Sequence, residues 1–141
     1  MKDIKYELCG VTVEQFATLF EPQSDNIGLE VSIPIKTNYD GRAFAVGADV
    51  QFTEDSKTFL VAKVYCHYDI EKSCWDELSD GGTKDVELPK QFMDSLARIA
   101  VGTARGVICA KTENTPFSRY SLPVIELEPS QEGDSFIIPK P

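Results

Sequence analysis

The sequence predicts an α+β fold in which a four-stranded antiparallel β-meander is followed by a long α-helix packed on the sheet. Three observations lead to this prediction. Segments with apolar residues at alternate positions fill the first half of the chain, and this is the period of a strand with one buried face. Short turn sequences separate these segments. A single long helical pattern begins at Leu88-Pro89, and no internal repeat interrupts the order.

The length and composition describe one soluble globular domain. With 141 residues, 42% hydrophobic and 26% charged, the chain is able to bury about two-thirds of its surface without metals or disulfides. The net charge of −9 argues against nucleic acid and anionic lipid, which bind basic residues. It allows a basic partner, or it serves solubility. We expect residues 1–127 to form the domain and residues 128–141 to be a proline-containing C-terminal tail.

The N-terminal sequence and the cysteines indicate a reducing compartment. MKDIKYELCG has no apolar run like that of a signal peptide, and no stretch reaches the roughly 20 uncharged residues of a membrane span. We therefore expect a cytoplasmic protein. Cys9, Cys66, Cys74 and Cys109 are widely spaced and form no C-x-x-C pair, so we expect reduced and partly buried side chains.

The first two strands are expected in the N-terminal third of the chain. In the first, Ile4 to Phe20, the alternation changes phase at Gly10, which indicates a bulge or bend. The second, Ile27 to Thr37, alternates cleanly, although Pro34 marks an edge or an irregular position because it lacks a backbone N–H. The Asp-Gly within NYDGR (Asn38 to Arg42) predicts a hairpin turn.

The third strand, Arg42 to Thr53, and the fourth, Thr58 to Ile70, are separated by the turn EDSK. Each has a row of apolar side chains on a single face. Four consecutive strands with short connections predict an antiparallel meander. The two rows expected to point into the core are Phe44, Val46, Val50, Phe52, Leu60, Ala62, Val64, Cys66, Tyr68 and Ile70.

The segment Glu71 to Val86 has no regular period, and we expect it to be irregular. The helix follows in LPKQFMDSLARIAVGTARGVICAKT (Leu88 to Thr112), where Pro89 suits the first helical position. No further long helix is expected after Pro123, because prolines recur in the remaining chain.

The helix is apolar around more of its circumference than one sheet is able to cover. Its small residues, Gly102 and Gly106 among them, allow close approach of another helix. We expect one side to pack on the sheet of its own chain and the other on a second subunit. The alternative is a central helix buried within a monomer. The residues predicted to pack in the oligomer interface are Leu96, Ala100, Thr103, Ala104 and Val107.

Signals of an enzyme are weak, and we expect no catalytic residues, no metal and no cofactor. His67 is the only histidine. It follows Cys66, but neighbours on a strand point to opposite faces and cannot form a nucleophile–base pair. CHYDIEKSC (Cys66 to Cys74) lacks the usual spacing of metal ligands. DGGTK (Asp80 to Lys84) lacks the full phosphate-loop pattern, so a plain loop is expected.

Aromatic residues beyond the need of the core are the strongest functional signal. They fall in loops or on faces opposite the predicted inward rows, and exposed patches of this kind usually bind other molecules. The alternative is that a subunit interface buries them. The residues are Phe16, Phe20, Phe59, Tyr65 and Trp75.

The order of these parts resembles the SecB family of protein-export chaperones. In that family a four-stranded meander, an irregular crossover and a long proline-started helix follow one another. The helix ends near an Arg-Gly dipeptide, matched by Arg105-Gly106, and an extended segment follows, matched at Leu122-Pro123. VTVEQF (Val11 to Phe16) resembles the first-strand motif. The resemblance covers roughly residues 4 to 127, and its strength lies in the order of the parts.

The resemblance implies a homotetramer, a dimer of dimers with the long helices between two sheets. It implies a protein without enzymatic activity that holds unfolded or precursor polypeptides in apolar grooves, without ATP, and delivers them to the SecA motor. Burial of apolar client segments supplies the binding energy. On this basis the five aromatic residues are predicted to contact the client.

Two departures from the family affect the prediction. The family's second C-terminal helix, which helps to form the groove, is replaced here by a short proline-rich region. The family also docks SecA through acids on the outer sheet face. Glu14 fits one such position, whereas Leu60 and Ala62 stand where the fourth strand would offer another. A SecB-like protein dedicated to one partner, such as an antitoxin, is therefore the alternative to general export.

Overall fold

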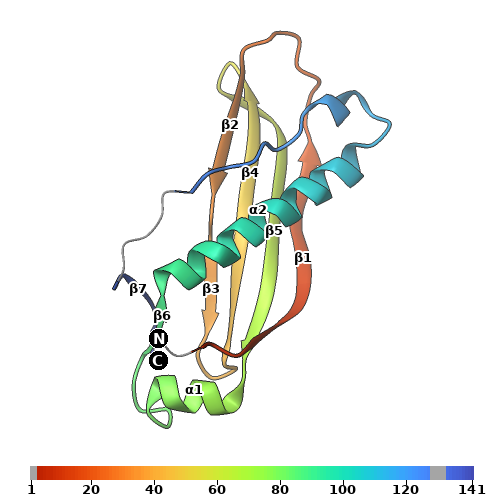
Figure 1. Ribbon diagram of the computed structural model, residues 1–141. Helices are drawn as coiled ribbons and strands as arrows, with labels where there is room; N and C mark the ends of the chain where they lie inside the picture. The colour runs from red at the N-terminus through yellow and green to blue at the C-terminus, as the bar shows by residue number, and fades with distance from the viewer. Residues whose placement is uncertain (1–2, 128–132) are drawn as a thin grey trace.

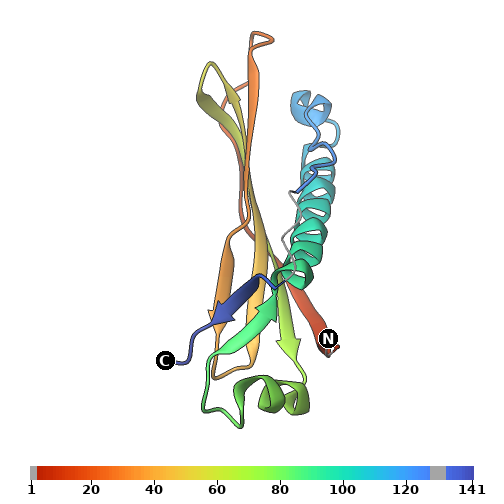
Figure 2. The same cartoon turned by 60° about the vertical axis from the view of Figure 1, so that its left-hand side comes forward.

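The computed structural model describes residues 3–127 and 133–141. It shows two layers, a five-stranded antiparallel sheet and one long helix, α2, that crosses one face of it (Figures 1 and 2). The predicted α+β class, with a helix packed on an antiparallel sheet, is confirmed. We call the face that carries α2 the helix side and the opposite face the outer side.

The strand order differs from a simple meander. The order is β1-β5-β4-β2, with β3 also paired to β4, so the chain crosses from one edge of the sheet to the other after β1. β1 has 13 residues and β5 has 14, whereas β2 has 6. Pairing β1 with β5 therefore satisfies more backbone groups than pairing it with β2 would. The strands are β1 (Tyr6–Thr18), β2 (Ile27–Ser32), β3 (Ile35–Asn38), β4 (Ala43–Glu54) and β5 (Lys57–Ile70).

Proline and turn residues set the limits of these strands as the sequence predicts. The predicted second strand is divided at Ile33-Pro34 into β2 and β3, on the edge of the sheet. Between β4 and β5 the turn residues Asp55 and Ser56 have φ of 49° and 69°. Two successive residues with positive φ match the twist of a tight hairpin.

Bulges change which side chains face the helix. β1 has register shifts next to Gly10, as predicted, and also at Glu14, where the sequence shows no signal. A third shift lies on β5, because Phe52 pairs with Leu60 while Thr53 pairs with Thr58. Phe59 is thus the extra residue of a bulge, and the simple alternation along β5 fails at this position.

The core lies between the helix side of the sheet and α2 (Lys90–Thr112). Both predicted inward rows, from Phe44 to Phe52 and from Leu60 to Ile70, are buried there. The helix begins one residue later than predicted. Pro89 has an extended ψ of 135° and caps the helix rather than starting it.

The remaining elements lie at the two ends of the sheet (Figure 1). The segment predicted to be irregular contains the short helix α1 (Lys72–Ser79), which buries Cys74, Trp75 and Ser79. β6 (Val86–Pro89) pairs with β7 (Ser135–Ile138), so part of the predicted tail returns to the fold. After α2 comes the 3-10 helix η1 (Pro116–Arg119). Residues 128–132, where the predicted domain boundary falls, lie outside the described residues.

Candidate polypeptide-binding surface

The long helix covers only a diagonal band of the sheet. α2 runs from the β3 side at one end toward β1 at the other, as Figure 1 shows. It packs mainly on β4 and β5. The helix side of the sheet therefore extends beyond α2 in two areas. The chain's own segment 116–127 lies over one of them, beside β4, and the other lies along β1.

An aromatic cluster occupies the end of the sheet where β1 stops and η1 begins. At its centre is Phe59, which is fully buried. Ring centroids of Tyr120, Phe20, Phe52 and Phe117 lie 4.9, 6.0, 6.2 and 6.3 Å from that of Phe59. Phe20 keeps 37% of its surface exposed. The cluster thus connects the sheet to the segment after α2, and Phe20 is its solvent-exposed member.

The segment after η1 lies on the helix side in extended form. Along residues 120–127 the side chains at 120, 122, 125 and 127 are buried or half-buried, and those between them are exposed. Tyr120, Ile125 and Leu127 pack against the core, and Leu122 is only 1% exposed. Arg105 of α2 fixes the backbone of this segment. Its Nε donates to the carbonyl of Leu122 at 2.6 Å and its Nη2 to that of Pro123 at 2.8 Å.

The second area is an exposed apolar row on the edge strand β1. Tyr6, Leu8, Val11 and Val13 face the helix side, each between 40% and 50% exposed. Ile99 on α2 is 45% exposed. Apolar area of this extent on an edge strand usually marks an interface. The sequence shows the alternation of β1, but it does not show that α2 leaves these side chains half exposed.

The structure brings only part of the predicted aromatic set to the surface. Phe20 is exposed and Phe16 is half-buried, with Lys111 Nζ 5.8 Å from the centre of its ring. Phe59, Tyr65 and Trp75 are buried, so the expectation of exposure was wrong for these three.

Each of the three has a physical reason for its burial. The bulge in β5 places Phe59 in the aromatic cluster. Tyr65 lies on the outer side over Gly47, where a Cβ would stand 2.8 Å from its ring, and beneath Lys36 Nζ at 4.2 Å. Trp75 belongs to α1 rather than to a loop, and its ring meets that of Tyr39 edge-on at 5.1 Å.

The two predicted docking residues lie on opposite sides of the sheet. Glu14 lies on the outer side, where its carboxylate is 2.7 Å from Lys36 Nζ and 3.8 Å from Lys63 Nζ. The hydrogen bond from Lys36 lowers the pKa of Glu14. Leu60 is fully buried on the helix side, so its assignment to a docking face was wrong. Leu60 pairs with Phe52 in the core register.

The predicted interface residues of α2 mostly face the chain's own sheet. Leu96, Ala100 and Ala104 are fully buried, so they are not available to a second subunit. Thr103 and Val107 are half-buried. The outward face instead carries Ile99, Gly106 and Cys109. The helical period predicted from the sequence is correct, but the face of α2 with more of the large apolar residues packs on the chain's own sheet.

The pair Cys66 and His67 is divided between the two sides, as predicted. Cys66 Sγ donates to Thr103 Oγ1 on α2 at 3.6 Å, and His67 Nε2 lies 2.8 Å from Thr12 Oγ1 on β1. Within the described part of the chain, no group of three or more histidine, cysteine or acidic residues is placed to hold a metal ion. None of the described helices is long and apolar enough to cross a membrane.

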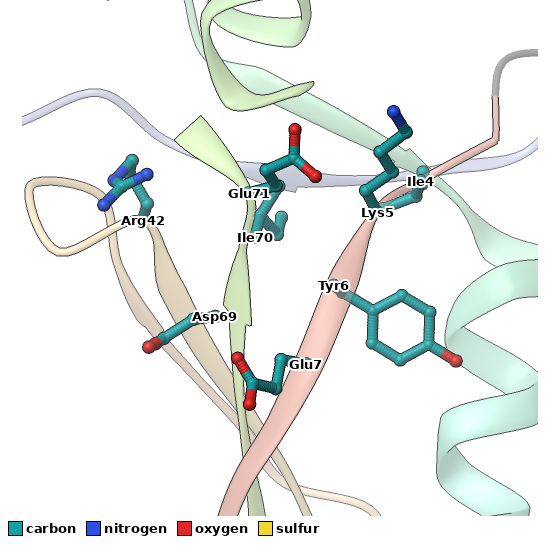
Figure 3. Close-up of a pocket in the computed structure, with 8 residues that line it drawn as sticks. All are labelled: Ile4, Lys5, Tyr6, Glu7, Arg42, Asp69, Ile70 and Glu71. Atoms are coloured by element: carbon teal, nitrogen blue, oxygen red, sulfur yellow. The ribbon is translucent and has the colours of Figure 1, made fainter. Parts of the chain in front are cut away.

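An open hollow of about 580 Å³ lies where β1 begins and β5 ends (Figure 3). Its lining carries charges of both signs. In Figure 3 the side chains of Glu7 and Asp69, from paired strands, lie near each other, while Lys5 and Arg42 lie on either side of Glu71. No cysteine, serine or histidine is among the lining residues, which are Ile4, Lys5, Tyr6, Glu7, Arg42, Asp69, Ile70 and Glu71. The described residues of this lining therefore offer no nucleophile–base pair.

Comparison with known proteins identifies a solved structure with a similar fold. No family model and no curated protein matches the sequence. Among solved structures, the chain is similar to the Mycobacterium tuberculosis SecB-like chaperone Rv1957, determined in complex with a ChAD peptide from the Rv1956 HigA1 antitoxin. The TM-score is 0.51 at 10% sequence identity, and the alignment covers 86% of this chain and 91% of that one. At this identity the similarity shows the fold alone, and the fold of this chain is SecB-like.

Proposed function

We propose that this protein is a holding chaperone that binds extended apolar segments of unfolded or precursor polypeptides, without ATP or any cofactor. The observation that carries the proposal is the segment 120–127, an extended stretch of polypeptide seated on the helix side of the sheet. A surface that holds this segment through apolar side chains spaced two or three residues apart is suited to clients of the same kind. The SecB-like fold supports the proposal.

The client surface is centred on the aromatic cluster. Phe20 and Phe16 are the accessible members of the predicted client-binding set, and both lie near the end of β1. Burial of client side chains against them removes apolar area from water, at about 25 cal/mol per Å². Phe59→Asp does not test binding, because a charge at this fully buried position would disrupt the fold.

Assembly and delivery complete the proposal. We place a homotetramer, a dimer of dimers, on the outward face of α2 and the exposed row of β1, and we expect a cytoplasmic location. Delivery to SecA has one candidate acid, Glu14. Because Lys36 and Lys63 already neutralise its carboxylate, a SecA contact there requires these ion pairs to open.

The alternative is a SecB-like protein dedicated to one partner. The similar Mycobacterium tuberculosis chaperone was solved with an antitoxin peptide, which favours this second candidate. The two functions differ in range. A general holder suppresses aggregation of unrelated clients, whereas a dedicated protein binds one protein tightly and leaves the others unprotected.

Light scattering of a chemically denatured protein diluted into nucleotide-free buffer tests the proposal. We expect suppression of scattering at about one tetramer per client, and none from an equal mass of an unrelated acidic protein. Phe20→Asp should weaken suppression several-fold. Ile137→Asp is the matched control, since Ile137 is also an exposed apolar residue, 48% exposed against 37% for Phe20, but lies on β7. Failure to suppress the aggregation of several unrelated clients would reject general holding in favour of the dedicated function.

A further inference from the structure

The segment 120–127 is held in a way that differs from a strand of the sheet. Within the described residues, no backbone–backbone hydrogen bond involves residues 121–127. The two backbone contacts are made by a side chain, the Arg105 guanidinium, to the carbonyls of Leu122 and Pro123. The rest of the attachment is apolar contact. Val124, in the middle of the segment, is 83% exposed.

The surface beneath the segment is apolar and would be open without it. Tyr120 lies 4.9 Å from Phe59 and 6.1 Å from Phe52, measured between ring centroids. Phe59 has no exposed surface while Tyr120 and its neighbours in the cluster are in place. Removal of residues 120–127 would therefore uncover an aromatic floor beside α2, with the Arg105 guanidinium free to bind another carbonyl.

The contacts of Arg105 carry no information about sequence. Every polypeptide offers backbone carbonyls, and a guanidinium presents several donors in a fixed fork. The sequence requirement lies in the seated side chains, an aromatic at position 120 and aliphatic residues at 122, 125 and 127. An incoming extended polypeptide with apolar residues at this spacing is able to replace every contact that the segment makes.

We propose that the surface beneath residues 120–127 is the client groove and that these residues are a resident competitor, which an extended apolar polypeptide displaces. This inference rests on the proposed function and adds the mechanism of that site. A tethered competitor acts at a high effective concentration, so it lowers the apparent affinity for every client. Weak clients are thereby excluded, and only segments that match the groove well enter it.

A peptide added in trans tests the competition. The probe is a dye-labelled peptide with the sequence of residues 117–127, followed by fluorescence anisotropy. Leu122→Ser weakens the resident segment but leaves the groove intact, so we expect it to bind the probe at least fivefold more tightly than the wild type. Val124→Ser, a change at the exposed position of the same segment, should bind the probe like the wild type. Equal or weaker binding by a folded Leu122→Ser variant would overturn the proposal.

A labelling experiment covers the case in which Leu122→Ser fails to fold. Leu122→Cys is made in a Cys9→Ser, Cys109→Ser background, which removes the two exposed thiols. Because position 122 is buried, its reaction with a thiol reagent should be slow and should accelerate several-fold when the unlabelled 117–127 peptide is added. A rate that the peptide does not change would mean that the segment stays in place, against the proposal.

The two proposals fail in different ways. If the peptide displaces the segment but the protein does not suppress client aggregation, the competition stands and the holding function fails. If the wild type suppresses aggregation while the thiol of the Leu122→Cys variant remains unreactive in the presence of the peptide and of a denatured client, holding stands and displacement fails.

Discussion

Tyr68 carries a polar group that the fold does not satisfy. Its side chain is 2% exposed, packed against Phe44 and Tyr6, and its hydroxyl has no hydrogen-bond partner among the described residues. Burial raises the pKa of Tyr68 from 10.0 to about 12. A raised pKa means that the folded state binds this proton more tightly than the unfolded state does. The stabilisation that comes from keeping the Tyr68 hydroxyl protonated is therefore complete below pH 10 and is lost as the pH rises toward 12.

Tyr68→Phe should accordingly be neutral or stabilising. An unsatisfied buried hydroxyl costs about 1–3 kcal/mol, and phenylalanine keeps the packing of the ring. We expect the free energy of unfolding at pH 8 to be unchanged or higher, and the loss of stability between pH 10 and 12 to be smaller than in the wild type. Urea unfolding at these pH values measures both effects. A clear loss of stability at pH 8 would mean that the hydroxyl has a partner, for example in a second copy.

At the scale of the elements, α2 has one face that stabilises the fold and another that does not. Leu96 is fully buried against the sheet, whereas Ile99 is 45% exposed. Leu96→Ala should lower the free energy of unfolding by about 2–5 kcal/mol, because it leaves a cavity as well as losing apolar burial. Ile99→Ala should cost less than about 0.5 kcal/mol in the isolated subunit. Urea unfolding of the two variants, at a concentration where the protein is monomeric, would contradict this assignment if the order were reversed.

The elements show what the sequence was able to predict. Periodicity located the strands and α2 to within a few residues, and Pro34 and Gly10 marked real irregularities. Which side chains face the core was harder to predict. The bulge that turns Phe59 toward the helix side leaves no mark in the alternation. Trp75 lies on the short helix α1, whose eight residues give too little periodicity to recognise. Strand order was also hidden, because pairing between β1 and β5 depends on partners far apart in the sequence.

The candidate surface was predictable only in outline. The excess of aromatic residues indicated binding, and Phe20 is indeed accessible. The sequence predicts an extended, proline-containing segment at residues 120–127. Its position beside α2 depends on the hydrogen bonds from Arg105 to two carbonyls, and no sequence pattern indicates these bonds. The exposure of the β1 row depends on the angle at which α2 crosses the sheet, and no local pattern determines that angle.

At the scale of the whole molecule, the outward face of α2 and the β1 row are the surfaces proposed for assembly. Gly106 lies on this face of α2, and a Cβ built there meets no other atom within 4 Å. Gly106→Glu should keep the subunit folded and reduce the tetramer to smaller species, because a charged side chain prevents close approach of a second helix. Ala104→Glu, at a fully buried position, should instead unfold the subunit. Light scattering after size exclusion and circular dichroism distinguish these outcomes, and an intact Gly106→Glu tetramer would remove this face from the interface.

The place of β1 in the sheet has a consequence for how the protein is made. During synthesis β1 leaves the ribosome long before its partner strand, since Tyr6 pairs with Ile70. Until β5 follows, its apolar row and its backbone groups are open to other chains. The β1 segment of each nascent chain is therefore, for a time, an extended apolar polypeptide of the kind that a holding chaperone binds. Finished copies would find their first clients among their own nascent chains.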